Sequence, residues 1–213
     1  MNPAGSEVFI DRVRSGGQYE LEKWDIVKKS RHSILTTTEE RTSVGAITLN
    51  ASAGRFAVSA VPFQEEKPRI DCWTLSDKPT KIAINPRLAA TALDFSPDGK
   101  TLAAGYPDGS VAWYDTASGK IIKQLPAFAR LSVGSVEFHP SGKYIACGTF
   151  DTGKPNLFFV SVETGEVVTV VLADKGGVTG VCFSPAGDRV AAFGASGTVT
   201  IWDATKLLKL KPE

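Results

Sequence analysis

Histidines and cysteines are the side chains of this sequence best suited to chemistry, yet their spacing supports neither a metal site nor a nucleophile. There are only two histidines, His32 and His139, and neither stands at ligand spacing from a cysteine or a carboxylate. His139 occupies a turn position that serine fills at Ser96 and Ser184. We therefore interpret His139 as a turn residue and predict no metal ion and no cofactor.

Aspartates recur in equivalent places along the chain, which favours a structural role over a catalytic one. One set is Asp25, Asp115 and Asp203, and another is Asp98, Asp108 and Asp151. An Asp at a strand end accepts backbone N–H bonds in the following turn, whereas a catalytic pair of carboxylates would occur once. The motifs GxSxG, GxxxxGK[ST] and GxGxxG after a strand are absent. We predict that the chain is not an enzyme.

Aromatic and basic residues in the expected loops favour recognition of a partner. They break the pattern that the rest of the chain repeats, and such residues on a rigid scaffold are what a recognition surface requires. Ordinary loop variability is the alternative interpretation. The candidate partner-binding residues are Phe63, Arg69, Arg87, Phe128, Arg130, Phe150, Lys154 and Lys175.

A repeated segment must position these loops. Its regular copies read LDFSPDGKTLAAG, VEFHPSGKYIACG and VCFSPAGDRVAAFG, and ITLNASAGRFAVSA is a weaker copy. The last strand residue before the turn is Leu49, Phe95, Phe138 or Phe183, at intervals of 46, 43 and 45 residues. Each copy predicts a short apolar strand, a tight turn closed by glycine, and a second strand rich in small residues. A period of about 40–45 residues is the length of one four-stranded propeller blade.

The third strand of each period carries a resemblance to the WD-repeat family of β-propellers. The matching pairs are Trp24-Asp25, Trp73-Thr74, Tyr114-Asp115, Val160-Ser161 and Trp202-Asp203. We interpret their aromatic residues as a packing column between blades. The family's Gly-His pair before the first strand is missing from every period, as in many bacterial-type members. The resemblance covers nearly the whole chain and implies an all-β propeller with a scaffolding role.

The expected strands add up to about four and a half four-stranded blades, which is a partial or open propeller. Residues 1–43 form a partial first blade without an inner strand, and residues 44–84, 85–125, 126–172 and 173–213 form four further blades. The last blade ends in a poor fourth strand at 204–211. Since propellers have about four to eight blades, three explanations stay open. The chain is the C-terminal part of a longer propeller, it associates with a second chain (including its own copy) to close the ring, or it closes alone.

Composition and the chain ends narrow the classes of partner and the cellular location that we expect for the protein. The net charge is +1 and the pI is about 7.7, so bulk charge does not favour nucleic acid. Three cysteines, Cys72, Cys147 and Cys182, lie in expected strands without CxxC spacing, so we expect all three to be buried and reduced. The N-terminus lacks signal-peptide features, and the longest apolar run, 167–173, is too short to span a bilayer. We predict a cytoplasmic protein that binds neither nucleic acid nor membrane.

The preferred hypothesis is a non-catalytic scaffold that binds a protein or peptide. Its binding face would carry the loops that join the fourth strand to the next first strand, and the second strand to the third. The alternatives are a sensor or ligand-binding propeller module, or a hydrolase-type propeller enzyme, within a longer multidomain protein. Such a site would need acids or histidines clustered after the first strands, where the sequence has only Asn50, Ser96, His139 and Ser184.

Overall fold

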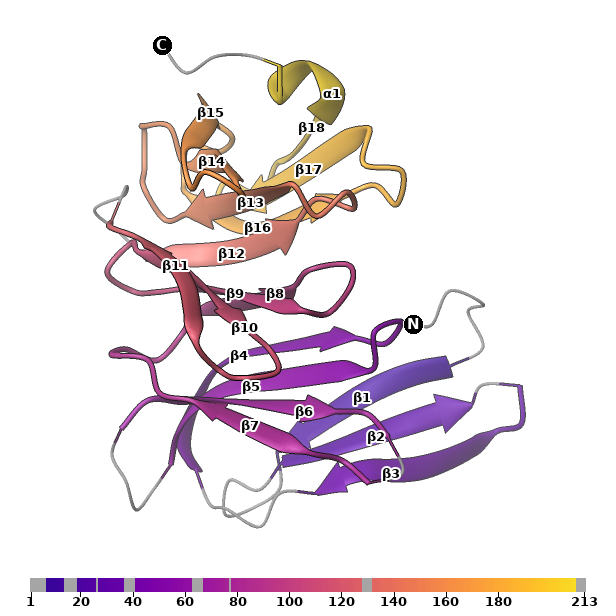
Figure 1. The fold of residues 1–213 in the computed structure, drawn as a ribbon. Helices are drawn as coiled ribbons and strands as arrows, with labels where there is room; N and C mark the ends of the chain where they lie inside the picture. Colours follow the sequence, from indigo (N-terminus) through magenta and orange to yellow (C-terminus); the bar gives the residue numbers. More distant parts are fainter. Residues whose placement is uncertain are drawn as a thin grey trace.

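Five antiparallel sheets make up the described part of the chain. The computed structural model describes residues 7–13, 19–25, 27–36, 41–62, 67–76, 78–127 and 132–209 of the 213-residue sequence. The sheets follow one another in chain order from sheet 1 at the bottom of Figure 1 to sheet 5 at the top. The prediction of an all-β, open propeller is confirmed, because sheets 2 to 5 pack side by side through their first strands and the described sheets do not form a closed ring.

Sheet 1 has three strands, sheets 2 to 4 have four each, and sheet 5 has three. Sheet 1 comprises β1 (Glu7–Val13), β2 (Tyr19–Asp25) and β3 (Ser30–Thr36). Sheet 2 comprises β4 (Arg41–Asn50), β5 (Arg55–Pro62), β6 (Arg69–Thr74) and β7 (Lys81–Ile84). Sheet 3 comprises β8 (Ala92–Phe95), β9 (Thr101–Gly105), β10 (Val111–Asp115) and β11 (Ile121–Leu125). Sheet 4 comprises β12 (Val133–Phe138), β13 (Tyr144–Thr149), β14 (Leu157–Ser161) and β15 (Val167–Val171), and sheet 5 comprises β16 (Val178–Phe183), β17 (Arg189–Gly194) and β18 (Val199–Asp203).

Tight turns join the first and second strands as the sequence predicts. Gly99 and Gly142 have φ values of 69° and 70°, and each donates its backbone N–H to the carbonyl three residues earlier at 2.8 Å. Glycine takes this left-handed conformation without the steric penalty of a Cβ atom. Every first strand therefore lies directly beside its second strand, and the first strands β4, β8, β12 and β16 contact one another in succession.

The core lies between the sheets. Trp113 of sheet 3 and Phe159 of sheet 4 are 1% and 0% exposed, and each belongs to an apolar cluster shared with the next sheet. The sheets approach most closely at Gly105 and Gly148. A Cβ atom at either glycine would lie 2.4 Å from a valine methyl carbon of the next first strand. Small residues in the second strand are therefore required by the packing of sheet on sheet.

Sheet 5 differs from the sheets before it because no described residue covers its outer face. Val199 and Ile201 of β18 are 66% and 63% exposed, although Leu157 and Phe159 at the same positions of β14 are fully buried. Phe193 stands where sheets 3 and 4 have glycine, and it is 47% exposed. We call Phe193, Val199 and Ile201 the open face.

Two sequence expectations fail in sheet 5. Cys72 and Cys147 are buried as expected, but Cys182 is exposed, because β16 directs it toward the uncovered side of the sheet. The expected fourth strand is also wrong where it is described, since Ala204–Leu207 form the short helix α1. Asp203 caps this helix by accepting the Lys206 N–H, and Leu207 packs into the apolar cluster between sheets 4 and 5. Among the described residues, no helix has the length and apolar character needed to cross a membrane.

Candidate protein-binding surface

Connected loops on one side of the sheets form a continuous surface, which we call the loop face. It comprises residues 85–91, 106–110, 150–156, 172–177 and 195–198, which follow fourth strands or link second to third strands. Hydrogen bonds and close contacts run from loop to loop along it. Val133 donates to the Tyr106 carbonyl, Phe150 donates to the Ser132 carbonyl, and Gly177 lies against the Phe150 backbone. The loops are thus held by one another as well as by their strands.

Side-chain hydrogen bonds hold the loop face at its sheet 5 end. Asp174 accepts hydrogen bonds from the hydroxyls of Ser196 and Thr198, and from the Gly176 N–H at 2.7 Å. These hydrogen bonds lower the pKa of Asp174 below its usual value, and the bond from the Ser196 hydroxyl has the largest effect. Asn156 donates to the carbonyls of Asp151 and Asp174 and so links two neighbouring loops. Loops fixed in this way present their exposed side chains with little freedom to rearrange.

The structure places the candidate partner-binding residues in three groups. Arg87, Phe150, Lys154 and Lys175 are exposed on the loop face. Phe63, Phe128 and Arg130 lie outside the described residues. Arg69 is 8% exposed because it begins β6 and its guanidinium forms a buried ion pair with Asp71, at 2.8 Å from Nε to Oδ1. This ion pair keeps Arg69 away from the loop face.

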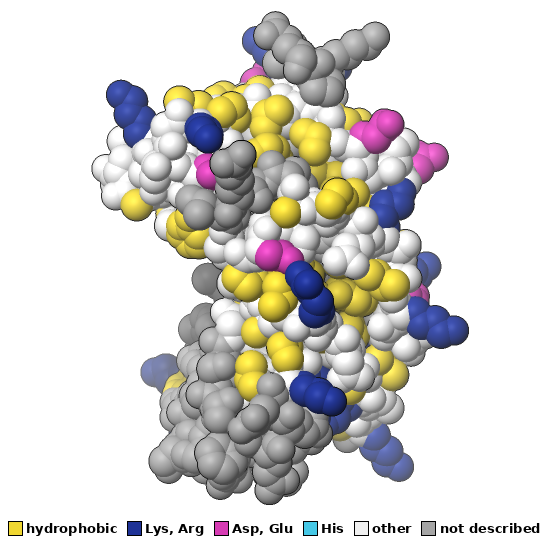
Figure 2. Space-filling view, turned by 90° about the vertical axis from the view of Figure 1, so that its left-hand side faces the viewer, with side chains coloured by type: hydrophobic (Ala, Val, Ile, Leu, Met, Phe, Trp, Pro, Cys, Tyr) yellow, Lys and Arg dark blue, Asp and Glu magenta, His cyan; other side chains and the backbone are white. Residues whose placement is uncertain are grey.

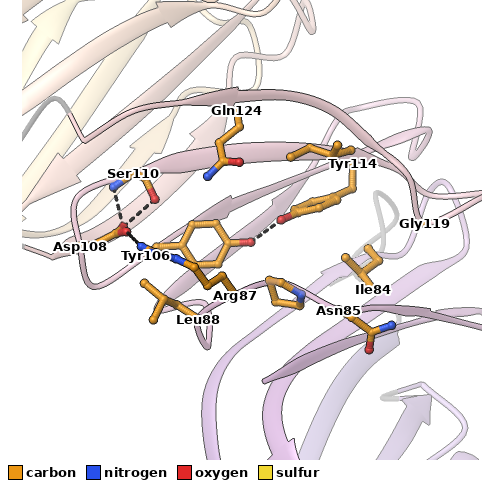
Figure 3. Close-up of a pocket in the computed structure, with 12 residues that line it drawn as sticks. Ile84, Asn85, Arg87, Leu88, Tyr106, Asp108, Ser110, Tyr114, Gly119 and Gln124 are labelled. Atoms are coloured by element: carbon orange, nitrogen blue, oxygen red, sulfur yellow. Dashed lines mark hydrogen bonds and ion pairs between the residues drawn. The ribbon is translucent and has the colours of Figure 1, made fainter. Parts of the chain in front are cut away.

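A pocket of about 310 Å³ opens between sheets 2 and 3, beside Arg87 (Figure 3). Its apolar walls include Ile84, Leu88 and Ile121, and its floor carries Tyr106 and Tyr114. The WD-repeat pattern predicted Tyr114 only as a packing residue, and no motif in the sequence pointed to Tyr106. The repeat itself held a signal, because the residues equivalent to Tyr106 in the next two sheets are not aromatic. They are Thr149 and Gly194.

The two tyrosines are joined through their hydroxyl groups, which lie 2.6 Å apart. Tyr106 is 3% exposed and Tyr114 is 6% exposed. Burial raises the pKa of both phenols above the usual value, so both are neutral at physiological pH. A neutral pair of hydroxyls can both donate and accept hydrogen bonds.

An ion pair stands at the loop-face end of the pocket. Arg87 Nη2 lies 3.0 Å from Asp108 Oδ2, and the Asp108 carboxylate also accepts from the Ser110 hydroxyl at 2.6 Å and from the Ser110 N–H at 3.0 Å. Burial alone would raise the pKa of Asp108, but the Ser110 hydrogen bonds and the Arg87 guanidinium lower it below its usual value. The charges at this end of the pocket therefore neutralise each other.

The first strands β8 and β12 carry Asp94 and Glu137, the one pair of acids with raised pKa values among the described residues. Asp94 of β8 accepts the Phe138 N–H at 2.7 Å, and burial, with the nearby Glu137 charge, raises its pKa. Burial raises the pKa of Glu137 to about 7. The described residues include no group of three His, Cys, Asp or Glu side chains that could hold a metal ion.

Polar residues after the first strands tie neighbouring sheets together. His139 Nε2 donates to the Gly187 carbonyl of sheet 5 at 2.9 Å, while its Nδ1 accepts from the Ser141 N–H at 3.0 Å. Asn50 of sheet 2 donates to the Ser96 carbonyl of sheet 3 at 2.9 Å. His139 does lie in a turn, and the structure adds an inter-sheet hydrogen bond that its serine counterparts are too short to copy.

Comparison with known proteins agrees with this geometry. The sheets define a β-propeller, and the fold matches the crystal structure of a computationally designed protein, Ika8, with a TM-score of 0.69 at 17% identity, over 93% of this chain and 56% of that one. The family model described as "Vps8 beta-propeller" matches residues 73–175, and "WD domain, G-beta repeat" matches residues 165–203. The resemblance to WD-repeat proteins that the sequence predicted is therefore confirmed over residues 73–203.

Two curated relatives show the same kinship over part of their length. Meiotic recombination protein rec14 of Schizosaccharomyces pombe is 35% identical over 108 residues, which is 51% of this chain and 34% of rec14. Serine-threonine kinase receptor-associated protein of Gallus gallus is 25% identical over 134 residues, which is 62% of this chain and 36% of that protein. The matched part of the chain thus spans about a third of each relative.

Proposed function

We propose that this chain is a non-catalytic interaction scaffold that binds a protein partner on its loop face. WD-repeat relatives are typically protein-interaction scaffolds, which supports the general role. The observation that carries the choice of face is the placement of Phe150, which is 39% exposed yet held in a fixed position. Its backbone N–H donates to the Ser132 carbonyl at 3.1 Å, and its ring lies so close to Gly134 that a Cβ atom there would be 2.8 Å from it.

A pre-positioned aromatic ring costs little conformational entropy when a partner covers it. Lys154 and Lys175, on the same run of loops, are both exposed. Figure 2 views the molecule from this side, where hydrophobic side chains lie among Lys and Arg side chains and acidic side chains are few. An exposed aromatic ring with two exposed lysines on the same run of loops suits a partner that presents an apolar side chain flanked by acidic residues.

Charge reversal on the loop face tests the proposal. The double variant Lys154→Glu/Lys175→Glu is compared with Lys100→Glu/Lys143→Glu, which reverses two exposed lysines in the turns between first and second strands. Both variants change the net charge equally, and circular dichroism checks that both keep their fold. Proteins recovered from native lysate by the wild type should be lost with the first variant and kept with the second. Equal recovery by both variants would contradict the loop face as the binding surface.

Phe150→Ala gives a second measure of the same surface. The change removes the exposed ring without removing the backbone bond to Ser132. Truncation of a central aromatic anchor costs about 2 kcal/mol or more of binding free energy. Partner recovery should therefore fall sharply, and unchanged recovery would remove Phe150 from the interface.

A further inference from the structure

The pocket between sheets 2 and 3 combines apolar walls with a pair of buried tyrosine hydroxyls. It runs from the Arg87–Asp108 ion pair at the loop face, past the outer strand β7, to the turn at Gly119 (Figure 3). Its volume of about 310 Å³ is at the lower end of the range for small-molecule sites. The size suits one large side chain with its neighbouring peptide group.

The tyrosine pair on the pocket floor has a hydrogen-bond donor to spare. Two hydroxyl groups carry two hydrogens, and the contact between Tyr106 and Tyr114 uses one of them. No other hydrogen bond to either hydroxyl occurs among the described residues. Both side chains are more than nine-tenths buried, and their hydroxyls meet in the space between the lining residues in Figure 3. Buried donors in proteins are nearly always satisfied, so an acceptor from a ligand or solvent belongs here.

The charges around the pocket select a neutral acceptor. Arg87 is already neutralised by Asp108, and a ligand carboxylate would meet the Asp108 charge as well. A ligand cation would find the Asp108 carboxylate already bonded to Arg87 and Ser110. A peptide carbonyl is a neutral acceptor, and the walls formed by Ile84, Leu88 and Ile121 are apolar.

The same arrangement does not recur in the neighbouring sheets. The positions of Tyr106 and Tyr114 are filled by Ala60 and Trp73 in sheet 2, by Thr149 and Val160 in sheet 4, and by Gly194 and Trp202 in sheet 5. A feature that the repeat requires for packing would be expected in every copy. Its restriction to sheet 3 points to a role outside the repeat.

We propose that this pocket receives one large apolar side chain of a partner peptide, and that the tyrosine pair donates a hydrogen bond to a backbone carbonyl of the same peptide. The inference deepens the proposed function and rests on it, because the pocket opens at the loop face beside Arg87. It adds the kind of peptide that is recognised: a large aliphatic or aromatic residue in an extended segment whose carbonyl is free to accept.

Two tryptophan variants test the proposal, one that fills the pocket and one at the matching position of sheet 4. Gln124 of β11 lines the pocket, and Val170 holds the same position in the outer strand of sheet 4. The probe is a phage-displayed random peptide library selected on the whole chain, followed by affinity measurement with the enriched peptides. Gln124→Trp should weaken their binding about tenfold or more, and Val170→Trp should leave it within about twofold. Enriched peptides should share a large apolar residue.

Two further measurements locate the peptide. The variant Tyr106→Phe/Tyr114→Phe removes both donors while keeping the rings, and should also weaken binding about tenfold. In methyl NMR spectra, an enriched peptide should shift the signals of Ile84 and Ile121 in the wild type and not in Gln124→Trp.

The outcomes separate this inference from the proposed function. A library that yields no peptides, or only peptides that bind Gln124→Trp as tightly as the wild type, overturns the pocket proposal. The loop face would still stand if Lys154→Glu/Lys175→Glu abolished recovery of protein partners. If the peptides depend on the pocket while the charge-reversal variant recovers every partner, the pocket stands and the loop-face interface fails.

Discussion

Replacing the side chain at one equivalent strand position by alanine should strongly destabilise the chain in sheet 4 and have little effect in sheet 5. Phe159 of β14 and Ile201 of β18 are equivalent, since each pairs with an alanine of the adjacent second strand, Ala146 or Ala191. Phe159 is 0% exposed and packs between sheets 4 and 5, while Ile201 is 63% exposed on the open face. We predict that Phe159→Ala severely destabilises the chain and that Ile201→Ala does not.

The magnitudes follow from the burial of each side chain. Truncation of a fully buried phenylalanine costs about 3–5 kcal/mol, because the transfer free energy is lost and a cavity is left. Full burial of an isoleucine side chain is worth about 1.5–3 kcal/mol, so the third or so of Ile201 that is covered contributes roughly 1 kcal/mol or less. Phe159→Ala therefore removes a large share of the stability of a typical domain, which is about 5–15 kcal/mol.

Urea unfolding followed by circular dichroism measures both changes. The comparison is made at two protein concentrations, and equal m-values show that both variants unfold from a similar native state. If Ile201→Ala lowered the midpoint as much as Phe159→Ala does, the open face would be covered in solution and the exposure described above would not hold. A midpoint that rises with protein concentration would identify the cover as a second copy of the chain.

Three other outcomes follow from single sites. Burial raises the pKa of Glu137 to about 7 and also raises the pKa of Asp94, so protonation of this pair stabilises the fold. This contribution is complete below about pH 4.5 and is lost as the pH rises through 7. The free energy of unfolding measured with urea should therefore be higher at pH 5.5 than at pH 8 by about 1–3 kcal/mol, and Glu137→Gln should reduce the difference. His139→Ser should cost about 1 kcal/mol in the same assay, since it breaks the inter-sheet bond to Gly187, and an unchanged midpoint would show that this bond contributes nothing. Gly148→Val should prevent folding or cost several kcal/mol, because its Cβ would lie 2.4 Å from a methyl carbon of sheet 5, and a native thermal midpoint would refute that packing.

The strands and turns could be predicted because their signals are local. Pro-Asp-Gly after Ser96 fixes a tight turn, and the apolar residues on either side recur with each period. The first two strands of sheets 2 to 5 follow from this pattern and from the distance between its copies. The short helix α1 had a local signal too, since Asp203 precedes residues that suit a helix, but the repeat suggested a strand there.

Features that depend on contact between sheets could not be predicted. Cys182 lies in a strand like the other cysteines, and the strand pattern does not tell whether a further sheet covers it. Arg69 follows a loop in the sequence, and although its two-residue spacing puts it on the same face of β6 as Asp71, the sequence does not show that this face is buried. The hydroxyl contact joins Tyr106, which directly follows the second strand β9, to Tyr114 of the third strand β10, so the sequence shows only that an aromatic residue at position 106 breaks the repeat.

The one-sided packing of sheet 5 has a consequence for how the molecule opens. In a linear stack, each unit is stabilised mainly by its nearest neighbours, and sheet 5 has a described neighbour on one side only. Amide hydrogens of β17 and β18 should therefore exchange with solvent through local opening at a lower free energy than those of β9 and β13, which lie in sheets covered on both faces. Unfolding would then begin at this end of the stack, and the amides around the tyrosine pocket would stay protected after sheet 5 had opened.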